Sequence, residues 1–311
     1  MLNQQVIHRV QMNSHPHQKR SGTLLSVAIL LALFLPSTLS AKNPTHVVVV
    51  PVANMYSHPT DQSDVVSQAI FGSNIILLVA NGEWSQIQTD DHYKGWTPSR
   101  FLRLIQSGTG YATSGPILQV ESLFANIYRE PDLARQKPLL TIPFESQLEL
   151  IAEGKGKTEE GWLQVRLPDK TSAWIQSGDV VSDPKPLTIS ESIDLAKRFL
   201  GLPYLWGGRS TFGFDCSGFT QMLVRARGIT MPRDADKQAA WKGVTPVDRK
   251  DLQPGDLVFF GETPKRITHT GMYIGDGQFI NATTHDHPIV QIARLDDQPW
   301  TQLLVACRRL K

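Results

Sequence analysis

The chain contains only two cysteines, and they lie in different sequence surroundings. Cys216 comes just before an apolar pattern with helical spacing, which predicts a helix that begins near this cysteine and ends at Gly228. Free N–H groups at a helix N-terminus stabilise a thiolate, so Cys216 is a candidate nucleophile. Cys307 lies in an apolar run near the end of the chain, which predicts a buried strand thiol. A disulfide between them would disable the nucleophile, so we do not expect one.

A nucleophilic cysteine needs a base, usually histidine, and a third polar group that orients the base. His269 begins one strand-like run and Asn281 lies in the next, and residues 275–277 join them as a tight hairpin. In a two-residue turn Met272 faces Asn281, so His269 and Asn281 are not directly opposed. A bulge or an approach from the helix side could bring them to one end, and the spacing alone does not establish a triad.

The elements that must position these residues form one predicted domain, residues 188–311. A Pro-rich segment at 182–186 marks its start, and Thr188 with Glu191 predicts a capping box at the beginning of a first helix. The helix at Cys216 follows, and then come several strand-like runs. Helices followed by antiparallel strands indicate an α+β domain.

The region before this domain repeats itself. Each copy has an Asn–apolar–Tyr start, a Trp and a second Trp twelve residues later, and short β-branched runs separated by turns. The matching residues are Asn54, Tyr56, Trp84 and Trp96 in the first copy, and Asn126, Tyr128, Trp162 and Trp174 in the second. This repeat predicts two small all-β barrels over residues 44–105 and 115–182. We interpret the tryptophans as core packing, with ligand contact as the alternative.

Residues 1–41 have the pattern of a secretory signal peptide. Lys19 and Arg20 precede an apolar run at 23–35, and Pro36 and small residues follow it. An uncleaved signal anchor is the alternative, and Met12 could be the true start. We therefore expect export to the periplasm, the cell wall or the extracellular space, without stable membrane association after cleavage.

Composition excludes several other classes. The 31 Lys+Arg balance 29 Asp+Glu, so the net charge of +2 gives no basic stripe for nucleic acid. A hydrophobic content of 41% excludes a disordered chain. His285 and His287 lie in one loop without a further cluster of ligands, which is a weak metal signal. We expect no metal, no cofactor and a monomer.

The repeats resemble bacterial SH3 domains, although the second copy has Ala173 where the late Gly-Trp pair of that family has glycine. Four blocks of the last domain, at 204–208, 215–219, 254–260 and 269–275, resemble the NlpC-type cell-wall cysteine peptidases. This resemblance implies a papain-like α+β fold that cleaves peptide bonds in the stem peptides of bacterial cell walls. It makes Cys216 the nucleophile and His269 the base. It places Asn281 at a third polar position that is commonly His, and Tyr204 in the active-site lining.

Relatives that combine SH3 domains with this peptidase domain often cut between γ-D-glutamate and the diamino acid, and many require a free N-terminal L-alanine. The resemblance then implies that Asp215 and Ser217 bind the amine and that Tyr93 of the first SH3 domain closes the pocket. Helix capping is the alternative role for Asp215, and a surface position is the alternative for Tyr93. The alternative functions are an amidase that cuts the muramoyl–alanine bond, another amide hydrolase or acyltransferase, and an inactive wall-binding protein. The sequence leaves open whether the third stem residue is diaminopimelate or lysine and whether the SH3 domains bind the wall or gate the cleft.

Overall fold

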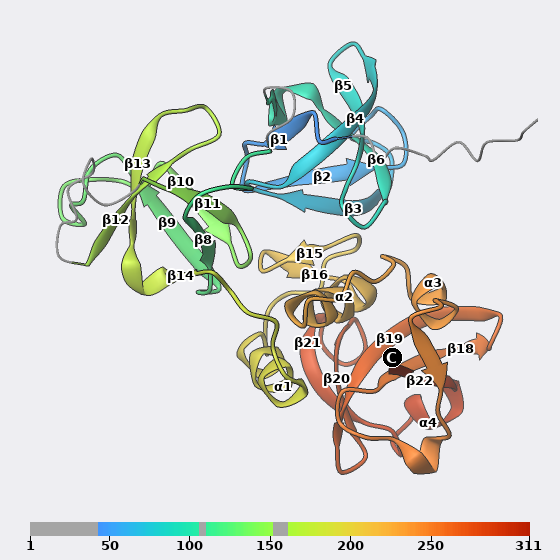
Figure 1. Cartoon of the computed structure of the whole chain (residues 1–311). Coiled ribbons are helices and arrows are strands. Elements are labelled where there is room, and N and C mark those ends of the chain that lie inside the picture. The colour runs from blue at the N-terminus through green and yellow to red at the C-terminus, as the bar shows by residue number, and fades with distance from the viewer. Residues whose placement is uncertain (1–42, 106–109, 152–160) are drawn as a thin grey trace, which may run out of the picture. The chain divides into compact units, whose positions relative to one another are not determined.

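The computed structural model describes residues 43–105, 110–151 and 161–311 (Figure 1). They belong to one compact unit. The signal segment predicted at 1–41 lies outside the described residues. In the described ranges, no helix is both long enough and apolar enough to cross a membrane.

The first part of the unit is a seven-stranded antiparallel sheet, coloured blue to cyan in Figure 1. Strand order is β3-β2-β6-β5-β4-β1-β7. Alternate residues point inward, so Ala53 and Met55 of β2 and Ile87 of β5 form the centre of a small apolar core. The strands are β1 (His46–Val48), β2 (Val52–Tyr56), β3 (Val65–Ile70), β4 (Asn74–Asn81), β5 (Trp84–Gln88), β6 (Lys94–Pro98) and β7 (Leu102–Leu104), with a 3-10 turn at Ser99–Phe101.

A second seven-stranded sheet has the same plan. Its order, β10-β9-β13-β12-β11-β8-β14, becomes that of the first sheet when seven is subtracted from each number. The repeated Tyr and Trp pack alike, edge to face, at 5.5 Å for Tyr56–Trp84 and 5.3 Å for Tyr128–Trp162. The two small all-β units predicted from the repeat are therefore confirmed. The strands are β8 (Ile117–Val120), β9 (Phe124–Tyr128), β10 (Leu140–Pro143), β11 (Gln147–Leu150), β12 (Trp162–Arg166), β13 (Ser172–Gln176) and β14 (Val180–Ser182), with a 3-10 turn at Ser177–Asp179.

The last part is the predicted α+β domain. Its first helix begins with the predicted capping box, in which Thr188 N–H donates to Glu191 Oε2 at 2.8 Å and Glu191 N–H donates to Thr188 Oγ1 at 3.3 Å. A six-stranded sheet follows, in the order β17-β22-β18-β19-β20-β21. The helices are α1 (Ile189–Arg198), α2 (Cys216–Ala226), α3 (Ala235–Ala239) and α4 (Trp300–Leu303), with a 3-10 turn at Arg249–Asp251. The strands are β15 (Arg209–Ser210), β16 (Gly213–Phe214), β17 (Val244–Pro246), β18 (Leu257–Thr263), β19 (Arg266–Gly275), β20 (Gln278–Thr283), β21 (Ile289–Arg294) and β22 (Leu304–Leu310).

Helix α2 lies at the centre of this domain, and its residues from Cys216 to Val224 are all buried. It packs against β19 and β20 on one side and α1 on another. Its Phe219 meets Phe199 and Phe214 edge to face in the core of the domain. A helix buried on all sides keeps its first residue in a fixed position, which suits a reactive side chain.

The hairpin of β19 and β20 corrects the predicted register. Gly275 pairs with Gln278 as predicted, but Met272 pairs with Ile280 rather than facing Asn281, because the register shifts by one residue at the turn. A one-residue shift moves side chains to the opposite face of a sheet. The bulge therefore puts His269 on the same face as Asn281, whereas the predicted register would have separated them.

The first sheet domain contacts the α+β domain through β3. The Gln68 side-chain oxygen accepts hydrogen bonds from the Arg209 backbone N–H at 3.0 Å and the Ser210 hydroxyl at 3.1 Å. From the β5–β6 loop, Asp91 Oδ2 accepts a hydrogen bond from Gln221 of α2 at 2.8 Å. These bonds bring the β5–β6 loop, which carries Tyr93, to the helix that begins at Cys216.

Candidate active site

Cys216 is the first residue of α2, as predicted, and its side chain is 8% exposed. Asp215 is the N-cap and accepts a 2.7 Å hydrogen bond from the Gly218 N–H. A Cβ at Gly218 would lie 2.1 Å from the Gly208 carbonyl oxygen, so only glycine lets this helical turn pack so closely. On the other side, Cys216 Sγ lies 4.0 Å from the carbonyl oxygen of Thr268, the residue before His269.

His269 and Asn281 are brought together by the shifted register. His269 Nε2 lies 2.8 Å from Asn281 Oδ1, and Asn281 is fully buried. The Asn281 Nδ2 donates to the Gln291 carbonyl oxygen at 3.2 Å, which orients the amide with its oxygen toward His269. That oxygen can only accept, so Nε2 carries the proton of the neutral imidazole. Nδ1 is therefore left free to accept a proton.

Gly271 makes room for this pair. A Cβ at Gly271 would lie 3.0 Å from Asn281 Cβ and 2.8 Å from a ring carbon of Phe279. The position lies between His269 and Asn281 on the same sheet face, so a larger residue there would displace Asn281. Sequence reasoning assigned Gly271 no role, because the need for space appears only once the bulge is known.

Trp300 is a second residue that the sequence did not reveal. It is the first residue of α4, it is 5% exposed, and its ring stacks on the His269 imidazole at 5.1 Å with an interplanar angle of 29°. Stacking on one face and the Asn281 hydrogen bond at one edge together fix the ring. Trp300 lies 31 residues beyond His269, and no spacing rule connects the two.

The charge states differ from the sequence expectation. Burial, together with the Asp215 carboxylate, raises the pKa of the Cys216 thiol to about 12, so these effects outweigh the helix N-terminus that was expected to lower this pKa. Burial lowers the pKa of His269 to about 4, although the Asn281 hydrogen bond and the Asp215 charge oppose that shift. Without substrate, the thiol and the imidazole are therefore both neutral near pH 7.

Alkylation of the ligand-free protein tests this electrostatic arrangement. With a Cys216 pKa near 12, the thiolate fraction at pH 7 is roughly 10³-fold below that of an unperturbed cysteine. Reaction of Cys307→Ala protein with iodoacetamide should be slower than that of free cysteine by about this factor and should rise about tenfold per pH unit up to pH 10. A rate that is constant between pH 4 and 8 would instead show a preformed thiolate–imidazolium pair and contradict the prediction.

Asp215 and Ser217, the predicted amine-binding residues, have a partner within the protein. Arg233 is 2% exposed and donates to both carboxylate oxygens of Asp215, at 2.9 and 2.6 Å. Its Nη1 also donates to Ser217 Oγ at 2.8 Å, and its Nε donates to Ser67 Oγ of β3 at 3.2 Å. The Gly207 and Gly218 N–H groups complete the set on Asp215. The capping alternative for Asp215 is thus present, and its charge is neutralised by a residue that sequence reasoning missed.

The two predicted tyrosines both lie near this ion pair, because the charges of Asp215 and Arg233 act on the pKa of each. Tyr204 lies near Cys216, and burial followed by the charges of Cys216 and Asp215 raises the pKa of the Tyr204 hydroxyl. Tyr93 lies beside Asp234, and burial together with the Asp234 carboxylate raises the pKa of Tyr93 to about 12. Asp234 precedes α3 but makes no side-chain cap hydrogen bond with that helix.

Among the described residues, no cluster of three or more His, Cys, Asp or Glu is arranged to hold a metal ion.

The chain is similar to known proteins over both its β and its α+β parts. The NlpC/P60 family model matches residues 201–309, and a model of the bacterial dipeptidyl-peptidase SH3 domain matches residues 55–102. A gamma-D-glutamyl-L-lysine dipeptidyl-peptidase of Bacillus cereus is 30% identical over 265 residues, which cover 80% of this chain and 76% of the relative. A protein of the same name from Bacillus subtilis is 32% identical over 259 residues, covering 79% and 81%.

A solved structure also resembles this chain over most of its length. A crystal structure of an NlpC/P60 family protein from Bacillus cereus has a TM-score of 0.73 at 26% identity, and the match covers 86% of this chain and 99% of that one. Fold and site together define a cysteine peptidase with an N-terminal SH3 domain. The chain belongs to the NlpC/P60 family. The SH3 family model covers only the first sheet, and the second shares its strand order.

Proposed function

We propose that this protein is a peptidoglycan endopeptidase that cleaves the bond between γ-D-glutamate and the diamino acid in stem peptides with a free N-terminal L-alanine. The observation that carries the proposal is the junction at the start of α2. Cys216 Sγ lies 4.0 Å from the carbonyl oxygen of Thr268, the residue before the His269 that is paired with Asn281. Tyr93 of the SH3 domain lies near Asp215, the N-cap of the same helix. Two relatives that match most of the chain are named gamma-D-glutamyl-L-lysine dipeptidyl-peptidases, which supports this bond as the target.

In the proposed reaction each catalytic residue has one step. His269 Nδ1 takes the Cys216 thiol proton as Sγ attacks the scissile carbonyl carbon, because Nε2 is already engaged with Asn281. The Cys216 N–H and the Tyr204 hydroxyl stabilise the developing oxyanion. His269 then gives the proton to the leaving amine, and an acyl-enzyme remains on Sγ. Water, deprotonated by His269, releases the peptide acid and restores the thiol.

Recognition of the free amine is assigned to Asp234 and Tyr93 rather than to Asp215 alone. Asp215 already accepts from Arg233 and from two backbone N–H groups, so an ammonium ion would have to displace donors. Asp234 is half-buried, and its side chain makes no cap hydrogen bond with α3. Burial raises the pKa of the Asp234 carboxyl, and the charge of Arg233 and then a hydrogen bond with the Tyr93 hydroxyl partly offset that rise. A carboxylate with open acceptor sites next to a tyrosine hydroxyl suits a primary ammonium.

Product analysis tests the reaction. A defined tripeptide or tetrapeptide with a free L-alanine should yield the L-Ala–γ-D-Glu dipeptide by mass spectrometry. The same peptide attached to a muramoyl group should be cut much more slowly, because its alanine amine is an amide. Release of intact stem peptide from the muramoyl form would indicate an amidase, and binding without any release would indicate a wall-binding protein. Substrates with lysine and diaminopimelate in parallel would identify the third residue.

Asp234→Asn should weaken recognition of the free amine. Loss of one charge-assisted hydrogen bond is worth about 1.5–3 kcal/mol, so KM for the free-amine peptide should rise roughly 10- to 150-fold, with a smaller change in kcat. Asp236→Asn is the matched control, because Asp236 lies on α3, is exposed and pairs with Lys237. An equal effect of both substitutions, or an equal loss on N-acetylated peptide, would remove Asp234 from this role.

Export is proposed on the same basis. The pattern at residues 19–41 is that of a signal peptide, and it alone supports export. N-terminal sequencing of the protein recovered from the extracytoplasmic fraction would show whether and where cleavage occurs. Recovery of the unprocessed chain in the membrane fraction would support the signal anchor instead.

A further inference from the structure

Gln221 is a buried residue of α2 whose side-chain amide contacts two separate loops. Its Nε2 donates one hydrogen bond to Asp91 Oδ2 of the β5–β6 loop and another to the Met231 carbonyl oxygen, each at 2.8 Å. The first loop belongs to the SH3 domain and carries Tyr93, whereas the second belongs to the peptidase domain and leads to Asp234. One NH₂ group therefore joins the two loops that supply the proposed amine site.

Asp91 divides its two carboxylate oxygens between its own loop and the helix. Oδ1 accepts hydrogen bonds from the Thr89 hydroxyl at 2.5 Å and from the Tyr93 N–H at 3.2 Å, which closes the turn. Oδ2 accepts the hydrogen bond from Gln221. Burial alone would raise the pKa of Asp91, but the charge of Arg209 and these hydrogen bonds outweigh it and hold that pKa below its usual value. Asp91 is therefore ionised near pH 7, and it connects α2 to the backbone of Tyr93 through charge-assisted hydrogen bonds.

The loop before Asp234 is held against the same helix by a second glutamine. Gln238 of α3 donates from Nε2 to the carbonyl oxygens of Pro232 and Ser217, both at 3.0 Å. Pro232 directly follows the residue that Gln221 binds, and Asp234 lies two positions further along. The position of the Asp234 backbone is therefore also set from α2.

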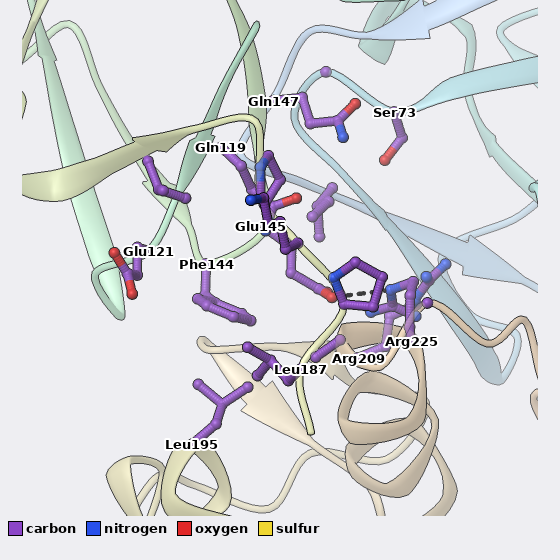
Figure 2. Close-up of a pocket in the computed structure, with 18 of the residues that line it drawn as sticks. Ser73, Gln119, Glu121, Phe144, Glu145, Gln147, Leu187, Leu195, Arg209 and Arg225 are labelled. Atoms are coloured by element: carbon purple, nitrogen blue, oxygen red, sulfur yellow. Dashed lines mark hydrogen bonds and ion pairs between the residues drawn. The ribbon is translucent and has the colours of Figure 1, made fainter. Parts of the chain in front are cut away.

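A cavity of about 870 Å³ lies beside the β5–β6 loop, between both sheet domains and the α+β domain (Figure 2). Thr89 and Asp90 line it from the loop, and Arg209 and Arg225 line it from the α+β domain. Figure 2 shows the two arginines together on one side, where Arg225 pairs with Glu145. Open space thus replaces side-chain packing on this side of the loop, so the position of the loop depends on its hydrogen bonds.

We propose that Gln221 is a positioning residue for recognition of the free amine, because it sets the separation between the Tyr93 hydroxyl and the Asp234 carboxylate. The inference rests on the proposed function, since it concerns the same amine site. The two groups come from different domains, so without a common anchor their separation would follow the motion of the SH3 domain. A primary ammonium needs both groups within hydrogen-bond distance at once, so loss of the anchor should weaken amine recognition more than the chemical step.

Gln221→Met tests the anchor, because it keeps the length of the side chain and removes its amide. The measured quantity is the free-amine preference, which is kcat/KM for a stem peptide with a free L-alanine divided by kcat/KM for the same peptide after N-acetylation. This preference should fall roughly tenfold, mainly through a higher KM of the free-amine peptide. Urea unfolding of each variant, measured alongside, reports the loss of stability separately.

Gln68→Met is the matched control for this substitution. Gln68 is also a buried amide between the SH3 domain and the peptidase domain, and its oxygen accepts hydrogen bonds from Arg209 and Ser210. Its replacement should lower stability but leave the free-amine preference unchanged, because neither partner belongs to the two loops.

Asp91→Asn tests the same hydrogen bond from the SH3 domain and leaves the buried α2 unaltered. It should lower the free-amine preference roughly threefold or more. Asp90→Asn is its matched control, because Asp90 is exposed and its charge, like that of Asp91, opposes the fall in the pKa of Arg209 that burial causes. The double variant of Asp91→Asn and Gln221→Met should lose no more preference than Gln221→Met alone, since both substitutions break one hydrogen bond.

The outcomes separate this inference from the proposed function. An unchanged preference in Gln221→Met and Asp91→Asn, an equal fall in Gln68→Met, or losses that multiply in the double variant would each overturn the role of Gln221 and leave the proposed function intact. Equal cleavage of both peptides by the wild type would contradict the proposed amine recognition, and the inference would fall with it. If Gln221→Met does not fold, the comparison of Asp91→Asn with Asp90→Asn decides.

Discussion

Replacing Cys216 with alanine should reduce kcat/KM for stem-peptide cleavage by roughly 10⁴-fold or more, because loss of a nucleophile removes the covalent route altogether. Substrate binding should persist, since the ion pair of Asp215 and Arg233 and the Tyr93–Asp234 pair do not depend on the thiol. Initial rates of dipeptide release, measured by mass spectrometry, and Kd for uncleaved peptide together check this expectation.

Cys307→Ala is the matched control, because Cys307 is the other buried thiol and lies in β22, paired with β18. It should retain the wild-type rate, with a modest loss of stability for the missing packing. Cleavage by Cys216→Ala at more than a few per cent of the wild-type rate would exclude Cys216 as the nucleophile. Loss of peptide binding in the same variant would mean that its substitution had disturbed the start of α2.

Replacing Arg233 with methionine should have the largest effect on stability. It leaves the Asp215 carboxylate buried without a counter-charge, and breaking a buried pair by removing one partner costs about 3–5 kcal/mol. The same change frees Ser67 of β3, so the contact between the SH3 domain and the peptidase domain should loosen as well. Urea unfolding of the full chain measures the loss, and peptide cleavage should fall with it.

Lys237→Met is the matched control for that experiment. Lys237 is an exposed cation that pairs with Asp236, and exposed pairs contribute about 0–1 kcal/mol. Joint replacement of Asp215 by Asn and Arg233 by Met should recover part of the stability, because no charge then remains buried. A loss below about 1 kcal/mol for Arg233→Met would show that Asp215 finds another partner.

Local patterns in the sequence predicted the parts of the site that lie in one element. The apolar spacing after Cys216 gave the start of α2, the Thr188–Glu191 pair gave the cap of α1, and the repeat gave two sheets of one topology. Each of these depends on contacts within a few residues or on direct comparison of two stretches. Strand β21 and helices α3 and α4 carried no comparable signal and were missed.

Local sequence patterns could not predict contacts between distant elements. The register shift after Tyr273 decided that His269 and Asn281 share a face, and a single bulge leaves no mark in the alternation of residues. Arg233 and Trp300 meet the site only after the chain has folded back on α2 and β19. The pKa of Cys216 was misjudged for the same reason, because its burial depends on the whole domain rather than on the helix start.

The hydrogen bonds that Arg233 and Arg209 donate to Ser67 and Gln68 of β3 bear on how such a chain can evolve. A domain that is tethered only by a linker can be exchanged by recombination without harm to its neighbour. Here an exchange of the SH3 domain would remove Ser67, a partner of the buried Arg233. It would also remove the β5–β6 loop that carries Tyr93. The stability of the peptidase domain and, in the proposed function, its substrate choice would change together, so selection should keep the SH3 domain and the peptidase domain together.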